Sequence, residues 1–306
     1  MLPLIIVNPT SAGGATLKSW PGIASELATH FGSFNRVFTS DRGDAVRLAT
    51  LGAQEGRHLI IACGGDGTTS EVANGILQSG IDVELGVLPS GTGGDFQRSL
   101  KIPGRLADAV RLLGKGRTRR IDVGRIVYMN HNGIEESRYF LGVASFGMSG
   151  EVIRRVKKSN STWLGGKPAF ALAMLQTTLT NQNTSAFVQL DDDRERRLTL
   201  ANLCIANGRY FGGGMKIAPE AKLDDGQFDI VTIGDLGALK ILTNAHQLYL
   251  GTHLGMKQVH HALAKRISAR PVTSDKPIAI EIDGELPGYL PAIFEIVPQA
   301  LSIRAC

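Results

Sequence analysis

The sequence predicts an α/β domain built on a parallel sheet, followed by a mainly antiparallel second domain. Up to about residue 125, short apolar runs alternate with stretches that carry apolar residues at helical spacing. After Asp122 the pattern changes to alternating apolar and polar residues, which is typical of antiparallel strands with one buried face. A chain of 306 residues is long enough for two domains, each with its own core.

The first part of the chain contains four short apolar runs that we interpret as strands. Strands that alternate with helices imply a parallel sheet, and such sheets bind ligands beyond the carboxyl ends of their strands. We therefore expect the four loops after these strands to share one edge. The expected strands are Leu4–Val7, Arg36–Thr39, His58–Cys63 and Leu85–Leu88, and the expected helices are Leu17–Phe31, Asp44–Gln54, Thr69–Leu77 and Arg105–Leu113.

The second part contains period-two stretches with helices between them. Pro168 suits the first turn of one of these helices, and the charged run from Asp191 to Asp193 is typical of a solvated hairpin turn. The expected strands are Arg138–Ala144, Ala186–Leu190, Leu198–Ala206, Phe228–Ile233, Lys265–Ala269 and Ile278–Ile282, and the expected helices are Gly150–Lys158, Pro168–Leu179 and Gly237–Tyr249.

Composition places the chain among globular proteins of the cytoplasm. With 43% hydrophobic and 20% charged residues, disordered, collagen-like and coiled-coil classes are excluded. Cys63 and Cys204 lie in apolar runs without metal-type spacing, so we expect buried thiols. No apolar run reaches transmembrane length, and the Leu4–Val7 run lacks the flanks of a signal peptide. The net charge of +5 and pI near 9.2 suit an anionic partner.

The strongest local signal is Gly64-Gly65-Asp66-Gly67-Thr68, where an apolar strand ends in glycines and a helix begins. Glycines let the backbone approach a ligand, and free N–H groups at a helix start favour phosphate. The carboxylate of Asp66 would repel phosphates unless a divalent cation or a hydrogen-bond donor offsets it. A packing turn with a capping box of Thr68 and Glu71 is the alternative that needs no ligand.

Three further loops follow the other expected strands. They are rich in glycine and in hydroxyl side chains, which suit a nucleotide, although each would be weak evidence alone. None matches the P-loop or the dinucleotide fingerprint. The loops are Asn8–Gly14, Thr39–Ala45 and Leu88–Arg98.

The loops around Asn8, Gly64–Thr68 and Pro89–Phe96, in this order and spacing, resemble the catalytic domain of the diacylglycerol kinase and sphingosine kinase superfamily, particularly its soluble bacterial lipid kinases. The segment Gly212–Asp229 and the closing Ile282–Glu285 extend the resemblance over essentially the whole chain. It implies a nucleotide-binding α/β domain similar to those of NAD kinases and phosphofructokinases, a β-sandwich-like second domain, and a cleft between them. The implied domains are residues 1–124 with 296–306, and 125–295.

The resemblance further implies an ATP-dependent kinase that transfers a γ-phosphoryl group to the hydroxyl of a membrane lipid such as diacylglycerol, with Mg²⁺ as a second cofactor. A structural magnesium site would fall on Asp225, with Lys222 and Gln227 contributing main-chain carbonyls. The implied ATP contacts are Asn8, Pro9, Thr10, Ser11, Ala12, Thr39, Gly64, Gly65, Asp66, Gly67, Thr68 and Thr92.

The proton acceptor implied by the resemblance is Glu285, with Asp283 as the second candidate and Asp66 organising magnesium. From the residues alone, Asp283-Gly284 is a β-hairpin turn, and Asp225-Gly226 is a turn as well. The sequence departs from the family in two loops: Gly94 stands where many members have Asn, and Ala12 stands where many have Gly.

Two other functions stay open at this stage: an NAD-kinase-like phosphotransferase with a soluble acceptor, and a nucleotide-binding regulator without catalysis. Basic clusters at 154–158 and 115–120 can bring the protein to the inner face of the membrane as a peripheral protein, or can be a solvated charged face. Nucleic acid is not expected, because the basic residues are not interleaved with aromatic ones. The oligomeric state is open, a homodimer included.

Overall fold

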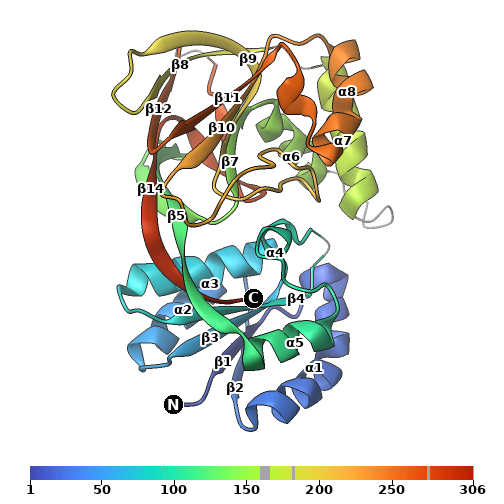
Figure 1. Ribbon diagram of the computed structural model, residues 1–306, viewed down its shortest axis with the longest axis vertical. Coiled ribbons are helices and arrows are strands. Elements are labelled where there is room, and N and C mark those ends of the chain that lie inside the picture. The colour runs from blue at the N-terminus through green and yellow to red at the C-terminus, as the bar shows by residue number, and fades with distance from the viewer. Residues whose placement is uncertain (92, 159–165, 181–182, 274–275, 306) are drawn as a thin grey trace. The chain divides into compact units, whose positions relative to one another are not determined.

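The computed structural model describes residues 1–306 apart from 92, 159–165, 181–182, 274–275 and 306 (Figure 1). The chain divides into two compact units. Unit 1 is Met1–Asp122 with Pro298–Cys306, and unit 2 is Val123–Val297. The chain passes between the units within two long strands, β5 (Arg117–Asn130) and β14 (Glu285–Ala305). The expected domain limits at 124 and 296 stay a prediction.

Unit 1 is built on a sheet with the order β2-β1-β3-β4, in which each neighbouring pair runs parallel. The C-terminal part of β14 lies beside β4, with Ile303 opposite Leu85. Val7 and Phe38 end neighbouring strands in register, and Val7 lies opposite Cys63, one residue before the end of β3, so the following loops start side by side. The strands are β1 (Leu4–Val7), β2 (Asn35–Phe38), β3 (Leu59–Gly64) and β4 (Glu84–Pro89).

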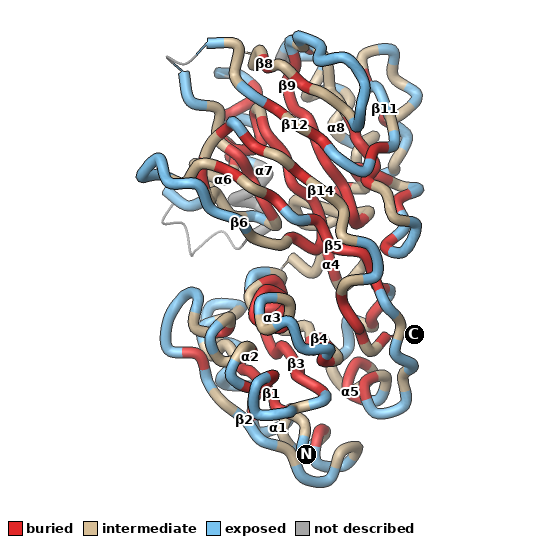
Figure 2. The backbone as a smooth tube through the Cα atoms, turned by 90° about the vertical axis from the view of Figure 1, so that its left-hand side faces the viewer, coloured by how far each residue is buried: buried red, intermediate tan, exposed pale blue. Residues whose placement is uncertain are grey.

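Helices cover both faces of this sheet. α1 packs against α5 and α2 against α3, and Figure 1 shows the two pairs on opposite faces. Figure 2 shows β1 and β3 as buried between them. The helices are η1 (Ser11–Gly14), α1 (Ala15–Phe31), α2 (Asp44–Gln54), α3 (Asp66–Ser79), α4 (Asp95–Ser99) and α5 (Leu106–Lys115).

The alternative interpretation of Thr68 and Glu71 as a capping box is wrong. α3 begins three residues earlier than predicted, with Gly65 at the N-cap position and no side-chain cap. Glu71 Oε1 instead accepts a hydrogen bond from the backbone N–H of Gly43, at 3.0 Å. The glycines allow this early start, because the backbone turns into the helix before the first hydroxyl residue.

Unit 2 is a mainly antiparallel β structure that closes on itself. The strands β7, β9, β8, β12, β14 and β13 each pair with the next, and β13 pairs with β7, so that six antiparallel pairings form a ring. β10 and β11 continue the sheet from β9. The strands are β6 (Glu135–Phe140), β7 (Val143–Gly147), β8 (Thr184–Leu190), β9 (Arg196–Ala206), β10 (Phe228–Gly234), β11 (Val259–Ala264), β12 (Arg266–Pro271) and β13 (Ala279–Ile282).

The helices of unit 2 lie where the sequence predicts helices, with ends shifted by one or two residues. They are α6 (Met148–Lys158), α7 (Gly166–Thr180) and α8 (Ala238–Leu250), with the short η2 (His253–Gly255) after them. Pro168 is the third residue of α7, within its first turn. Among the described residues, no helix combines the length and the apolar character that crossing a membrane requires.

The strand expected at Arg138–Ala144 is wrong as a single element. β6 ends at Phe140 and β7 begins at Val143, so Leu141 and Gly142 form a break. The period-two pattern continues across the break and therefore conceals it. The backbone N–H groups released at the break donate to a distant carboxylate, that of Asp283.

The core of unit 2 combines aliphatic and aromatic side chains, and alternation along the strands decides which residues enter it. Phe140 and Phe228 stack at 5.5 Å between ring centroids. Ile280 and Ile282 are fully buried in the same cluster. Glu281 therefore faces the opposite side of the sheet, because successive side chains of a strand alternate.

Gly124→Ala should destabilise the protein by about 1 to 3 kcal/mol, because the added methyl group overpacks the core. Gly124 lies directly opposite Phe140 in the β5–β6 pair, and its Cβ would overlap the Phe140 ring. Urea denaturation measures the change. Gly22→Ala in α1 is the control, since its Cβ meets nothing within 4 Å and should stabilise the helix. Equal stability of the two variants would contradict this account of the core.

Candidate functional site

The loops after the four parallel strands of unit 1 are joined to one another by backbone hydrogen bonds. Asn8 N–H donates to the Cys63 carbonyl at 3.0 Å, and Thr39 N–H donates to the Val7 carbonyl at 2.9 Å. Ser90 N–H donates to the Gly64 carbonyl at 2.8 Å. The loops therefore lie at one edge of the sheet, as the alternation of strands and helices predicted.

Side chains of the first loop (Asn8–Gly14) tie it to the glycine loop (Gly64–Thr68). Thr16, in the helix α1 that follows the first loop, contacts the fourth loop (Leu88–Arg98). Asn8 Nδ2 donates to Thr68 Oγ1 at 3.0 Å, and Ser11 Oγ accepts from Gly65 N–H at 3.3 Å. The buried Thr16 Oγ1 lies 2.6 Å from Ser90 Oγ and donates towards the Ser90 carbonyl at 3.0 Å. Thr16 belongs to no sequence motif, so sequence reasoning missed this link.

Two glycines allow the glycine loop and the fourth loop to touch through their backbones. A Cβ at Gly91 would lie 2.5 Å from Gly65 Cα and 3.2 Å from Gly65 N. Real Cβ atoms do not approach backbone so closely, so any larger residue at this position would push the two loops apart. The close approach explains the need for glycine at position 91, whereas a Cβ at Gly65 would lie 3.6 Å from Gly91 Cα, an ordinary contact.

Asp66 is the residue that holds these loops together. Its Oδ2 accepts from Gly94 N–H at 2.7 Å and from Asp95 N–H at 3.2 Å, and its Oδ1 accepts from Phe96 N–H at 3.3 Å. The sequence required either a cation or a hydrogen-bond donor beside this carboxylate. The protein itself supplies three donors, from the start of α4.

The two departures from the family pattern fall at left-handed backbone positions. Gly94 has φ 70° and Ala12 has φ 53°. Glycine and asparagine both tolerate this region, so Gly94 replaces the usual Asn without backbone strain. Ala12 has a Cβ where many members have Gly, which costs about 1 kcal/mol in this conformation.

The other expected nucleotide contacts lie along the same edge with different exposure. Thr39 and Thr68 are buried, Pro9 is half-buried, and Thr10 and Gly67 are exposed. Thr10 donates from both its N–H and its hydroxyl to Asn8 Oδ1, at 3.0 and 2.8 Å. Thr92 lies outside the described residues.

The Asp283-Gly284 turn of unit 2 joins β13 to β14. Both residues have positive φ, 47° and 85°, and Ile282 lies opposite Glu285, which is a two-residue hairpin turn of the type that Asp-Gly favours. Asp283 accepts hydrogen bonds from the N–H groups at the β6–β7 break: Leu141 at 2.9 Å, Gly142 at 3.0 Å and Val143 at 3.2 Å. Burial raises the pKa of Asp283, and these donors oppose the rise.

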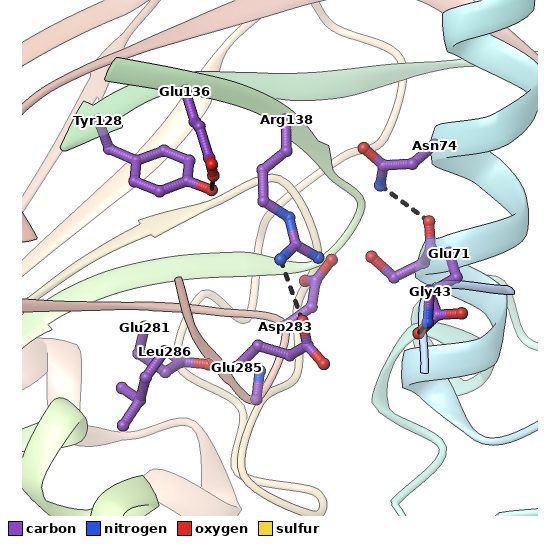
Figure 3. A network of polar contacts seen from close by, with 12 residues as sticks. Gly43, Glu71, Asn74, Tyr128, Glu136, Arg138, Glu281, Asp283, Glu285 and Leu286 are labelled. Carbon is purple, nitrogen blue, oxygen red and sulfur yellow. Dashed lines mark hydrogen bonds and ion pairs between the residues drawn. The ribbon is translucent and has the colours of Figure 1, made fainter. Parts of the chain in front are cut away.

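Two further carboxylates stand on either side of this turn. Glu281 is 5% exposed; its Oε1 accepts from Gly284 N–H at 2.6 Å, and its Oε2 accepts from Ser145 Oγ at 2.5 Å. Glu285 Oε2 forms an ion pair with Arg138 Nη1 at 3.0 Å, shown as a dashed line in Figure 3. Sequence reasoning missed Glu281 and Arg138. The only signal for Glu281 was a charged residue between two core isoleucines.

The expected metal residues lie together in a turn of unit 2. Lys222 and Asp225 are exposed, and Asp225 Oδ1 accepts from Gln227 N–H at 3.2 Å. Burial raises the pKa of the neighbouring Asp229, whose carboxylate pairs with His261 at 2.7 Å. In the part of the chain that the structure describes, no group of three or more His, Cys, Asp or Glu side chains is placed to hold a metal ion.

Comparison with known proteins gives the class of protein. Residues 3–126 match the diacylglycerol kinase catalytic domain, and residues 142–305 match the YegS C-terminal NAD kinase beta sandwich-like domain. The chain therefore belongs to the diacylglycerol kinase and YegS-type lipid kinase family.

Individual relatives match over almost the whole chain. A diacylglycerol kinase of Staphylococcus carnosus is 28% identical over 98% of this chain and 93% of its own length. One of Mycobacterium tuberculosis is 29% identical over 97% and 93%. A crystal structure from Bacillus anthracis is 25% identical and superimposes with a TM-score of 0.79, covering 100% of this chain and 97% of its own. A second structure, of a diacylglycerol kinase from that organism, has a TM-score of 0.74 at 23% identity over the same shares and shows the fold alone.

Gly91→Ala should separate the glycine loop from the fourth loop and destabilise unit 1 by about 1 to 3 kcal/mol, since the Cβ meets backbone that cannot turn away. Thermal denaturation gives the stability, and hydrogen exchange should quicken at the amides of 94–96 that donate to Asp66. The matched variant is Gly67→Ala, whose Cβ meets nothing within 4 Å. Unchanged exchange in Gly91→Ala would show that the loops do not depend on this contact.

Proposed function

We propose that this protein is an ATP-dependent lipid kinase that transfers the γ-phosphoryl group to the hydroxyl of a membrane lipid such as diacylglycerol. The observation that carries the proposal is the joined set of glycine loops at one edge of the parallel sheet, held by Asp66, in a chain of this kinase family. The relatives from S. carnosus and M. tuberculosis are named diacylglycerol kinases, which supports this acceptor class.

The loops of unit 1 have the chemistry that a nucleotide requires. Glycine at positions 65 and 91 leaves the backbone there without side chains, and the Asn8 amide and Thr68 hydroxyl hydrogen-bond to each other at the same edge. We propose that ATP is held by the loops that follow the four parallel strands of unit 1 and by the start of α3. The proposed contacts are Asn8, Pro9, Thr10, Ser11, Ala12, Thr39, Gly64, Gly65, Asp66, Gly67, Thr68 and Thr92.

The residues proposed to bind ATP can hold Mg²⁺ only together with the phosphates of the nucleotide. Mg²⁺ commonly takes one or two carboxylates and completes its coordination with phosphates and water, so it does not need a cage of protein side chains. Asp66 would contribute the carboxylate, directly or through water, while its N–H partners keep it in place. The ion would neutralise phosphate charge as the phosphoryl group moves. A second, structural ion would take Asp225, with main-chain carbonyls of Lys222 and Gln227.

At the γ-phosphorus, the proposed reaction forms one bond to oxygen and breaks another. The lipid hydroxyl oxygen bonds to the γ-phosphorus, the bond from this phosphorus to the β,γ-bridging oxygen breaks, and ADP leaves. The hydroxyl proton passes to Glu285, which acts as general base. Asp283 is the poorer candidate, because its oxygens already accept three backbone N–H groups.

We propose that the protein works in the cytoplasm as a peripheral protein on the inner face of the membrane. The basic segment 154–158 of α6 supports this, since Arg154 and Arg155 share the single carboxylate of Glu151 and leave an excess of positive charge. A juxtamembrane basic residue contributes about 1 kcal/mol to binding of an anionic lipid surface.

Transfer of labelled γ-phosphate to a panel of lipids in mixed micelles tests the proposed kinase function. ATP binding without any lipid product would overturn it.

Glu285→Gln should lower kcat by about 10²- to 10⁴-fold with little change in ATP affinity, because a proton acceptor is lost from unit 2 while the loops of unit 1 are untouched. Asp283→Asn should instead lower the melting temperature, since an amide cannot accept the three N–H bonds as a carboxylate does. Kinetics and thermal denaturation of both variants separate the roles. A folded but inactive Asp283→Asn beside an active Glu285→Gln would exchange the assignments.

Asp225→Ala should reduce the rise in melting temperature that magnesium produces, because a bound ion stabilises only the folded chain. Asp224→Ala is the matched control, as an exposed neighbouring carboxylate without a proposed ligand role. Melting curves are recorded with and without Mg²⁺. The structural metal site is wrong if wild type and Asp225→Ala respond identically.

A further inference from the structure

We propose that Arg138 is a positioning residue for Glu285: it fixes the direction of the Glu285 carboxylate and keeps it ionised, so that proton acceptance by Glu285 depends on an arginine of another strand. This inference rests on the proposed function, because Glu285 is there the general base. It adds a residue that the loops and motifs of the sequence do not reveal.

The backbone of Glu285 is fixed independently of Arg138. Asp283 binds the turn to the N–H groups at the β6–β7 break, and Glu281 accepts from Gly284 N–H. These contacts fix the backbone of the turn and do not involve the Glu285 side chain. The ion pair of Arg138 Nη1 with Glu285 Oε2, at 3.0 Å, restricts the torsions of that side chain.

The β5–β6 pairing fixes the backbone of Arg138. The residue lies two residues before the core residue Phe140, on the same side of the strand, and opposite Ile126 of β5. Its side chain is 20% exposed and that of Glu285 is 21% exposed. A pair that is about four-fifths buried is screened less by water than a surface pair, so its charges act strongly on each other.

Other titratable groups of unit 2 surround the pair, and Figure 3 shows several of them. Burial, with a hydrogen bond to Glu136, raises the pKa of Tyr128 to about 12; Glu285 acts in the same direction and Arg138 against it. Both charged groups of the pair therefore act on the buried Tyr128. The described groups of unit 2 that interact with the pair are Glu136 on β6, Tyr128 on β5 and Asp283 in the turn.

Most of these neighbours carry negative charge when ionised, so the guanidinium is the group that favours an ionised Glu285. A protonated Glu285 cannot accept the proton that the lipid hydroxyl releases when its oxygen bonds to the γ-phosphorus. Without Arg138, the carboxyl should stay protonated to higher pH, and the reaction should lose its base at neutral pH.

The experiment compares pH–rate profiles of wild type, Arg138→Gln and Arg138→Lys with a lipid acceptor. In Arg138→Gln the acidic limb of the pH profile of kcat should shift to higher pH by about 1 to 3 units. Activity should recover at high pH, and the KM for ATP should stay unchanged. Arg138→Lys keeps the charge and should show the smaller shift. Arg266→Gln is the matched control, since it breaks the exposed ion pair with Glu295 and should leave the profile in place.

Two further measurements keep the inference testable. In a Glu285→Gln background, Arg138→Gln should cost little more activity, because the neutral amide needs no counter-charge. Carboxyl-carbon NMR of glutamate-labelled protein, with Glu285→Gln to identify the resonance, follows the titration without substrate and should show it displaced to higher pH in Arg138→Gln.

The outcomes separate this inference from the proposed function. An active wild type whose Arg138→Gln variant loses activity equally at all pH values, or has a raised KM for ATP, would overturn the positioning role in favour of a structural or substrate-binding one. An unmoved Glu285 resonance would overturn it as well, whatever the activity. A wild type that phosphorylates no lipid would overturn the proposed function, and the NMR titration would still decide the effect of Arg138.

Discussion

The structure depends on carboxylates that accept several consecutive backbone N–H groups. Loops that leave a sheet carry N–H groups without ladder partners, and a buried N–H without an acceptor costs about 1 to 3 kcal/mol. Asp66 accepts from residues 94, 95 and 96, and Asp283 accepts from residues 141, 142 and 143. Asp191 does the same for Lys265 and Arg266, at 2.8 Å each. Each of these carboxylates joins segments that are distant in the chain.

This use of carboxylates divides the acidic residues of the proposed site into two kinds. Asp283 and Glu281 are engaged by the backbone and fix the hairpin turn, whereas Glu285 is held by a side chain, Arg138. A proton can bind Asp283 only where a backbone N–H group gives up its hydrogen bond to that carboxylate. This difference supports the proposal that Glu285, and not Asp283, is the general base.

In unit 1, the C-terminal segment is also held by hydrogen bonds to aspartate carboxylates. Asp122 accepts from Gln299 N–H at 2.7 Å, and Ser302 Oγ donates to Asp82 at 2.8 Å. Ile303 pairs beside β4, so the last strand completes the sheet that carries the glycine loops. The loops at the edge of that sheet thus rest on residues from both ends of the chain.

The sequence by itself determined the four parallel strands and the four long helices of unit 1, the shared edge of the loops and the Asp-Gly turn, because each depends on local spacing and on backbone freedom at glycine. It missed η1 and the parts of β5 and β14 that lie in unit 1. It could not determine which acids are engaged by the backbone. The partners of Asp66 lie 28 to 30 residues away, and those of Asp283 lie 140 to 142 residues away. Arg138 and Glu285 are separated by 147 residues. Only the tertiary structure decided these contacts and the break at Leu141-Gly142, because the pairing of distant strands, and no local pattern, brings the groups within hydrogen-bond distance.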